Sequence, residues 1–297
     1  MSDTQQTSNQ FHLQSGLHLL PQGDDEIFVR AGSRAAFSKV IRDEQGRHLL
    51  THVVQSSIKP TDVESLAARL NTSNDDVQAI VNRLLDEGVF VRPMQQRELH
   101  VLLISDGRIG SALYTTLEAM NATVVSRLNA SSDLEEIEAA MPDVGLVVVS
   151  TDMLRPRLNN DVNTLSYEIG VPVLYVYADG PDVQVGPLVY PGETACYACF
   201  EVQDEGARHL RDEFLVFKDD LARTGFSSDT APHIAAMAAA WAALCVADVQ
   251  AHEVSRLAER VVRIETQRFE VASHRVLQMP RCPQCSRHRP DLQHTFL

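Results

Sequence analysis

The feature that most constrains the fold is a regular alternation of apolar segments and helical patterns over residues 100–178. Strand-like segments that alternate with helices of about 10–15 residues indicate a parallel, doubly wound α/β sheet. Runs such as GLVVVS, apolar without interruption, are typical of a sheet covered on both faces. The expected strands are 100–105, 122–128, 143–152 and 171–178, and the expected helices are 110–120, 134–141 and 154–169. After residue 185 the pattern becomes irregular, apart from helices at 205–224 and 232–254 and late strands.

A different pattern precedes this alternation. Three short strand-like segments are followed by three helical patterns, an order that suggests a winged-helix-like module. Thr61 and Glu64 form a capping box for the second helix, Ser73 or Asn74 starts the third, and Gly88 ends it. The polar stretch RPMQQREL follows, so the sequence predicts two domains, 1–97 and 98–297. The early strands are 17–21, 26–32 and 36–42, and the helices are 47–55, 61–70 and 75–87.

Composition excludes several classes of protein. The chain is 44% hydrophobic and 22% charged, ordinary values for a soluble globular protein. Its net charge of −14 argues against nucleic acid or an anionic membrane as the main partner. The first ten residues lack the apolar core of a secretory signal. The apolar run 234–249 is shorter than a membrane span and is expected to be a buried helix. We therefore expect a cytoplasmic protein.

Two Cys-x-x-Cys pairs, Cys196 with Cys199 and Cys282 with Cys285, form the strongest local signal. Together they supply four thiolates to one tetrahedral zinc ion, a closed shell that leaves no position for a substrate. The sequence therefore predicts a structural zinc site. Disulfides and a redox motif are the alternatives, and both fit a cytosolic chain with two such pairs less well. Cys245, inside the alanine-rich helix, is expected to be a small buried hydrophobic residue.

The first expected strand ends in Ser-Asp-Gly-Arg-Ile-Gly, a degenerate dinucleotide-binding turn. Gly107 and Gly110 occupy fingerprint positions, but Ser105 replaces the first glycine and Asp106 adds a negative charge where a phosphate would lie. The second strand ends without the acidic residue that usually binds a ribose. We interpret the turn as a retained fold element rather than a working nucleotide site.

The run of residues 145–201 and the closing CPQC resemble the ThiF/MoeB adenylyltransferase superfamily. The end of that run, 186–201 (GPLVYPGETACYACFE), is similar, more narrowly, to ThiF-like leader-peptide-binding proteins of azoline-forming natural-product (RiPP) clusters. Asp152 and Arg155 stand where the superfamily has its aspartate and arginine. The superfamily's usual Asp-Asn pair, however, is Asp152-Met153 in this sequence, and the other triphosphate-binding residues are missing. The resemblance therefore implies a pseudoenzyme that needs no ATP and is not catalytic by itself, with Gly107, Gly110, Asp152 and Arg155 as its vestigial nucleotide site.

In the resembling family, the N-terminal domain captures the leader of a ribosomally made precursor peptide. The protein then presents the peptide to a YcaO-type cyclodehydratase, which forms thiazoline or oxazoline rings, in bacteriocin biosynthesis among other pathways. A leader could add as a strand to the edge 36–42, with helix 75–87 as the wall of the groove. A flavin dehydrogenase in the same complex and a homodimer are further candidate partners. The predicted peptide contacts are Phe37, Lys39, Val40, Arg42, Val77 and Arg83, although Val77 also fits a core position and Lys39 and Arg83 also fit solvated surface charges.

Two other classes of function remain open. One is an active adenylyltransferase that modifies a peptide or a sulfur-carrier C-terminus. The other is a winged-helix regulator, for which helix 75–87 would read DNA. That segment and its end carry one arginine against four acidic residues, a poor composition for a DNA reader.

Overall fold

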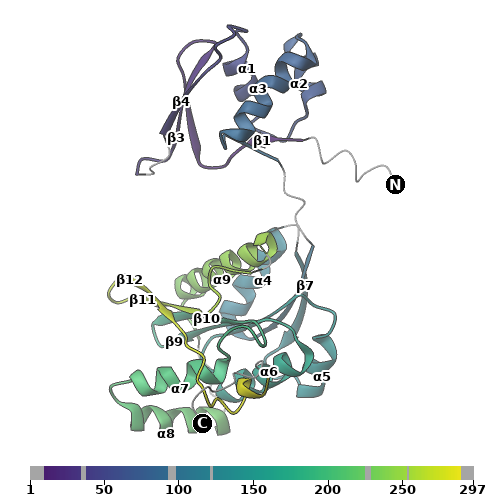
Figure 1. Cartoon of the computed structure of the whole chain (residues 1–297). Helices are drawn as coiled ribbons and strands as arrows, with labels where there is room; N and C mark the ends of the chain where they lie inside the picture. Colours follow the sequence, from purple (N-terminus) through teal and green to yellow (C-terminus); the bar gives the residue numbers. More distant parts are fainter. Residues whose placement is uncertain are drawn as a thin grey trace, which may run out of the picture. The chain divides into compact units, whose positions relative to one another are not determined.

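The computed structural model describes residues 10–34, 38–92, 98–120, 123–224, 229–252 and 254–288. The chain divides into two compact units, Met1–Gln96 and Arg97–Leu297. Each unit has its own hydrophobic core (Figure 1).

The first unit packs three helices against a three-stranded antiparallel sheet of order β2-β3-β4. Its core joins inward side chains of the strands, such as Ile27 and Val29, to helix residues such as Leu66 and Leu84, all less than 2% exposed. A two-stranded pair, β1 with β5, was not predicted. The elements are β1 (His12–Leu13), β2 (Leu17–Pro21), β3 (Glu26–Ala31), β4 (Ser38–Arg42), α1 (Leu50–Ser56), α2 (Val63–Leu70), α3 (Asn74–Asp86) and β5 (Phe90–Val91).

The start of α2 differs from the prediction. Asp62, not Thr61, is the N-cap, and its carboxylate accepts a hydrogen bond from the Ser65 amide at 2.8 Å. Thr61 is held in extended backbone because it exchanges two backbone hydrogen bonds with Phe11, at 2.8 and 2.9 Å. Helix α3 does begin after Ser73, whose hydroxyl accepts from the amide of Asp76 at 3.1 Å.

The second unit is built on a seven-stranded mixed sheet of order β12-β11-β10-β9-β8-β6-β7. The four predicted strands are present and parallel, in the order β9-β8-β6-β7. The sheet then continues through three antiparallel strands, β10 to β12. The strands are β6 (Leu99–Ser105), β7 (Thr123–Asn129), β8 (Leu146–Thr151), β9 (Val173–Asp179), β10 (Asp182–Val189), β11 (Arg260–Glu265) and β12 (Glu270–Arg275).

The expectation of irregular structure after residue 185 is wrong, because β10 runs on to Val189. Gly186 and Pro187 interrupt its apolar pattern, and the register with β9 shifts between Val185 and Leu188. The single helix expected over 205–224 is also wrong, since two helices, α7 and α8, are separated at residues 208–210.

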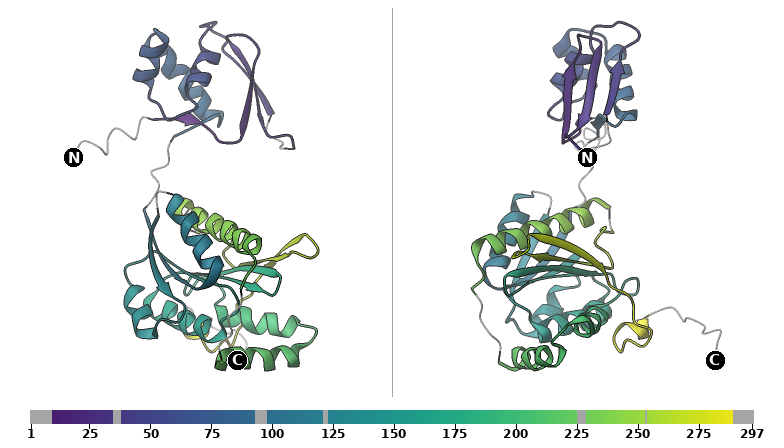
Figure 2. Two further views of the ribbon diagram at one scale, coloured as in Figure 1. Left: turned by 180° about the vertical axis from the view of Figure 1, so that it is seen from behind. Right: turned by 90° about the vertical axis from the view of Figure 1, so that its left-hand side faces the viewer.

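Helices cover both faces of this sheet (Figure 2). One layer consists of α4 and α9, which pack side by side over a core that includes Val101, Leu103 and Val185. The other layer consists of α5 to α8, and its core includes Val147, Tyr175 and the cysteines. The helices are α4 (Gly107–Ala119), α5 (Leu134–Ala140), α6 (Pro156–Ile169), α7 (Tyr197–Ala207), α8 (Arg211–Thr224) and α9 (Pro232–His252), with a short 3-10 turn, η2 (Cys285–His288).

Helix α9 is long and apolar enough to cross a membrane by length and composition, but 56% of its most apolar window is buried in the fold. Ala238, Ala242 and Val246 have no exposed surface where they face the sheet. This burial confirms the predicted core helix.

Candidate functional site

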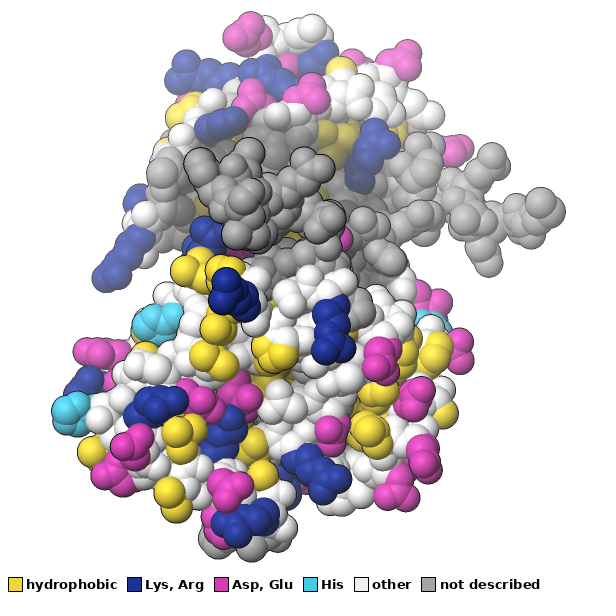
Figure 3. All heavy atoms as spheres, turned by 60° about the horizontal axis from the view of Figure 1, so that its bottom comes forward, with side chains coloured by type: hydrophobic (Ala, Val, Ile, Leu, Met, Phe, Trp, Pro, Cys, Tyr) yellow, Lys and Arg dark blue, Asp and Glu magenta, His cyan; other side chains and the backbone are white. Residues whose placement is uncertain are grey.

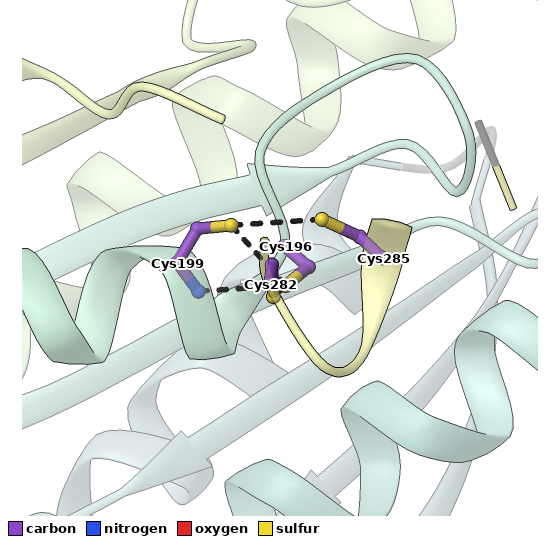
Figure 4. Close-up of side chains that lie close together, drawn as sticks. All are labelled: Cys196, Cys199, Cys282 and Cys285. Carbon is purple, nitrogen blue, oxygen red and sulfur yellow. Dashed lines mark hydrogen bonds between the residues drawn. The ribbon is translucent and has the colours of Figure 1, made fainter. Parts of the chain in front are cut away.

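Four cysteines meet where the start of α7 faces η2 (Figure 4). The Sγ of Cys196 lies 3.7 Å from that of Cys199 and 3.5 Å from that of Cys282, and the Sγ atoms of Cys199 and Cys285 are 3.5 Å apart. All four sulfurs lie within 4.8 Å of one another, and all four residues are buried. The structure therefore brings together both predicted Cys-x-x-Cys pairs, which we call the cysteine cluster.

The cluster fits a tetrahedral metal ion. A zinc–sulfur bond of about 2.3 Å places tetrahedral sulfurs about 3.8 Å apart, close to the observed spacings. These spacings are far longer than a disulfide bond, and the five cysteines are free thiols. The backbone also orients a ligand, because the Met279 amide donates to the Cys199 sulfur at 3.4 Å. Four protein donors would complete the shell, so the cluster suits a structural ion rather than catalysis.

Two thiols of the cluster, those of Cys196 and Cys199, have raised pKa values. The pKa of Cys196 is raised by hydrogen bonds with Cys199 and Cys285 and by desolvation. The hydrogen bond with Cys196 lowers the pKa of Cys199, but the bond with Cys285 and desolvation outweigh it and raise the value to about 11. Cys245 lies apart on α9, where burial first, and then Asp248, raises its pKa to about 12.

The glycine turn lies at the carboxyl ends of β6 and β8, where the order of the parallel strands reverses. Open α/β sheets bind ligands at this position. Here the carboxylate of Asp152 accepts hydrogen bonds from the amides of Arg108, at 2.9 Å, and Ile109, at 2.8 Å. The protein's own carboxylate thus occupies the anion position at the start of α4.

Gly107 is required by this arrangement. Its φ of +64° favours glycine, and a Cβ at this position would collide with the Asp152 carboxylate. Gly110 likewise lies against Ser105, so a Cβ there would approach its Oγ to 2.8 Å. The two glycines therefore allow close packing inside the protein rather than around a bound phosphate.

Arg155 makes a further contact within the glycine turn. Its guanidinium donates to Asp106 at 2.7 Å, and the other Asp106 oxygen accepts from the Asp152 amide at 3.2 Å. The Thr230 hydroxyl donates to the Asp152 carbonyl at 3.1 Å. We call Asp106, Gly107, Asp152 and Arg155 the switch-point crevice. Its predicted members do lie together, with Gly110 one turn along α4.

Sequence reasoning missed Arg127, which borders a hollow of about 370 Å³ beside the crevice. Its guanidinium donates to the Ser105 hydroxyl at 3.2 Å and lies 5.4 Å from the Tyr114 ring centroid. A single arginine in an apolar strand carries no signal that could have singled it out.

In the first unit, a hollow of about 230 Å³ separates the edge strand β4 from α3. Its floor is apolar and comes from three elements, through Ile41, Leu50 and Ile80, each less than 5% exposed. Arg83 crosses the end of the hollow and donates to the backbone carbonyl of Arg42 at 2.7 Å. We call this the β4–α3 groove. The floor residues were predicted only as core positions.

The six predicted peptide contacts have different surroundings. Lys39 lies on the helix side of β4 and pairs with Glu87 at the end of α3, at 2.6 Å. Val40 and Arg42 alternate with the buried Ile41, so they point to the opposite face of the sheet. Val77 has no exposed surface and packs in the core, and Phe37 lies outside the described residues.

Ion pairs fix the charges beside this groove. A hydrogen bond from Lys39 lowers the pKa of Glu87. On the outer face, the hydrogen bond between Arg42 and the cross-strand Glu26, at 2.6 Å, raises the pKa of Arg42. A larger hollow, about 830 Å³, opens between α2 and α3 and is bordered by the acidic Asp62, Glu64 and Asp75. No strand edge borders it among the lining residues, so it suits strand addition less well.

Comparisons with known proteins show the fold. No family model and no curated protein matches the chain. The heterocyclase TruD superposes with a TM-score of 0.68 at 18% identity, over 93% of this chain and 42% of TruD. Escherichia coli MccB, in a complex with AMPCPP and MccA, superposes with a TM-score of 0.57 at 15% identity, over 93% of this chain and 99% of MccB.

Another solved structure, of a heterocyclase in complex with substrate and cofactor, gives a TM-score of 0.69 at 17% identity, over 93% of this chain and 39% of that chain. The chain therefore spans about two fifths of the heterocyclases and the full length of MccB. It has the α/β fold that MccB and these heterocyclases share. At these identities the likeness concerns the fold alone.

Proposed function

We propose that this protein binds the leader of a ribosomally synthesised precursor peptide and presents it to a YcaO-type cyclodehydratase for azoline formation. Residues 1–97 act as a winged-helix-like recognition domain, and residues 98–297 act as a ThiF-like scaffold. The observation that carries this proposal is the edge of β4 beside the apolar-floored β4–α3 groove. A flavin dehydrogenase could belong to the same complex. We propose that this complex acts in the cytoplasm.

The groove suits an extended peptide. An incoming strand would pair with the backbone of β4 and place alternate side chains over Ile41, Leu50 and Ile80. Arg83 already bonds a carbonyl of that edge, so it is placed to contact the end of an added strand. Lys39 and Arg83 favour acidic side chains in the leader.

The second unit supports the non-catalytic part of the proposal. A nucleotide phosphate at the start of α4 would have to displace Asp152 from two amides, and it would meet the negative charges of Asp106 and Asp152. TruD is a heterocyclase more than twice as long as the region that this chain matches.

We also propose that the cysteine cluster binds one structural zinc ion. The ion would attach the segment before η2 to the start of α7, and its binding energy would stabilise the fold of the second unit. One zinc per chain by metal analysis is the expected result. An absence of metal in protein purified without chelators would contradict it.

The direct test is a calorimetric titration with the synthetic leader of a precursor peptide encoded beside this chain. Wild type should bind, and a truncation lacking residues 1–97 should not. The matched point variants are Arg83→Glu and Arg69→Glu, since Arg69 also donates to a backbone carbonyl, that of Ser56 at 2.6 Å, but lies outside the groove. Equal binding by wild type and truncation would refute the role of the first unit.

An active adenylyltransferase is the second candidate. Two buried polar atoms near the crevice, Ser150 Oγ and Arg155 Nε, lack a hydrogen-bond partner among the described residues. MccB, which matches over its full length, has been solved with ATP. ATP–pyrophosphate exchange by this chain, with the peptide present, would favour this candidate and overturn the scaffold proposal.

A further inference from the structure

The three-stranded sheet of the first unit has an apolar row on the face that its helices do not cover. The helices pack on one face of this sheet, and the right-hand view of Figure 2 shows the other face in front of them. On this outer face Leu20 pairs with Phe28, and Phe28 pairs with Val40. Leu20 is 54% exposed and Val40 is 53% exposed, whereas Phe28 between them is half-buried. We call these three residues the outer row.

The outer row differs from exposed apolar residues of the second unit. On the face in Figure 3, hydrophobic side chains are interspersed with acidic and basic ones. On α8, for example, Val216 is 71% exposed but lies close in sequence to Asp212 and Asp219. In the outer row, by contrast, three large apolar side chains follow one another across the strands with no charged residue between them. Cross-strand apolar pairs of this kind stabilise a sheet, so a further apolar neighbour at the end of the row would extend the same contact.

The backbone of β4 determines which of its residues an added strand would bind. In an antiparallel pair, residues that bond to the partner strand alternate with residues whose N–H and C=O point away from it. The Asp43 amide donates to the Asp25 carbonyl at 2.7 Å, toward β3. By this alternation Arg42 and Val40 point their backbone groups to the free edge, and the Arg42 carbonyl does accept from Arg83 there, at 2.7 Å. Arg83 thus occupies the acceptor of Arg42, and Val40 is the next residue of β4 that faces the edge.

The opposite edge of the sheet, on β2, suits an added strand less well. The Gln22 amide donates to the Glu26 carbonyl at 2.7 Å, toward β3. By the same alternation Leu20 also bonds toward β3, and Pro21 faces the free edge. Proline has no N–H, so the edge of β2 lacks a donor at that position. The end of the outer row at which a peptide strand would add is therefore Val40 rather than Leu20.

We propose that the outer row selects one residue of the leader, a large aliphatic or aromatic residue that packs beside Val40. This inference rests on the proposed binding of the leader to β4. The leader residue opposite Val40 projects its side chain on the outer face, where it becomes the fourth member of the row. Its two neighbours in the leader project to the other face, over the β4–α3 groove. The leader is thus recognised on both faces of the sheet, and its specificity depends on the outer row as well as on the groove.

Two matched variants of the full-length protein test this inference. Val40→Ser changes the end of the row beside the leader, and Leu20→Ser changes the far end at almost the same exposure. In a calorimetric titration with the synthetic leader of the precursor peptide encoded beside this chain, Val40→Ser should weaken binding about three- to fivefold and Leu20→Ser should not. Val40→Thr, which keeps a branched side chain suited to a strand, is the second variant if circular dichroism shows that Val40→Ser impairs folding. Unchanged affinity in the folded Val40 variant would overturn the inference and leave the proposed leader binding intact, whereas a wild type that does not bind the leader would overturn both.

A scan of the leader identifies the residue that the outer row selects. Each apolar leader residue is replaced with serine in turn, and each peptide is titrated into wild type and Val40→Ser. One position should lose affinity with wild type but not with Val40→Ser, because the effects of residues in contact are not additive. All five native cysteines are buried, so a cysteine at that leader position should form a disulfide with Val40→Cys and not with Leu20→Cys. Additive effects at every leader position, or equal disulfide formation with both cysteine variants, would overturn the inference.

Discussion

The switch-point crevice and the β4–α3 groove are both bounded by strands and helices, but they differ in what remains available to a ligand. In the crevice, the amides at the start of α4 are bonded to Asp152, and Arg155 is paired with Asp106. In the groove, β4 is an edge strand over an apolar floor. The protein closes the position at which its fold usually binds a ligand and leaves open an edge in the smaller unit.

The largest effect should follow from removing one ligand of the cysteine cluster, which lies in the same unit as the closed crevice but outside it. We expect Cys282→Ala to lose the metal and to lower the melting temperature of the second unit by about 10 °C, since saturating ligand contributes about 4 kcal/mol. Calorimetry with metal analysis would check both. Cys245→Ser, at a buried cysteine outside the cluster, should retain the metal, and loss of metal in both variants would contradict the assignment.

A second prediction concerns removal of the Asp152 carboxylate from the switch-point crevice. Asp152→Ala removes two acceptors from the start of α4 and should destabilise the second unit by about 2 kcal/mol, or about 5 °C. It should not create ATP binding. Asp229→Ala is the control, because Asp229 pairs with Arg108 but is 79% exposed, and it should change stability little. Tight ATP binding by the Asp152 variant would show that the crevice is autoinhibited rather than vestigial.

The role of the β4–α3 groove can be tested at Arg83. Reversing its charge should weaken leader binding about tenfold, because a hydrogen bond to a charged group contributes about 1.5 kcal/mol or more. Arg155→Ala in the crevice should leave the affinity unchanged. If the Arg155 variant weakened binding and the Arg83 variant did not, the assignment of the two regions would be reversed.

The smallest effect concerns the N-cap of α2, which lies in the same unit as the groove but does not line it. The Ser65 amide lowers the pKa of Asp62, so the folded state favours its charged form. Its contribution is therefore complete above the unfolded pKa and is lost as the pH falls through the folded value. Asp62→Ala should cost the first unit about 1 kcal/mol at neutral pH. Asp62→Asn keeps the acceptor, so urea unfolding should show a smaller loss and little of the acid dependence.

Much of the second unit could be predicted because its signals are local. Continuous apolar runs and Cys-x-x-Cys spacing need no knowledge of distant residues, and they located β6 to β9 and the cysteine cluster. The strand β10 was not predicted, because Gly186 and Pro187 interrupt its apolar pattern and its antiparallel pairing is set by neighbouring strands. The β1–β5 pair joins residues far apart in the chain, which no short pattern reveals.

The groove was predictable in position but not in detail. Helical spacing places Val77 on an apolar face, yet spacing cannot tell whether that face meets the core or a ligand, and the structure places it in the core. Strand alternation would have separated Lys39 from Val40 and Arg42 once Ile41 was known to be buried. The closing role of Asp152 depends on its distance from the Arg108 and Ile109 amides, which sequence spacing does not contain.

The cysteine cluster also sets an order of events during synthesis. Its first pair leaves the ribosome with the start of α7, and its second pair follows almost ninety residues later, after α9 and the last strands. At typical rates of translation, about 5–20 residues per second, this interval lasts about 4–17 s. During it, Cys196 and Cys199 lack the other two thiols of the proposed zinc site and are open to oxidants and to other metals. The last step in maturing the second unit is therefore the arrival of Cys282 and Cys285, when the first unit has long been free to fold.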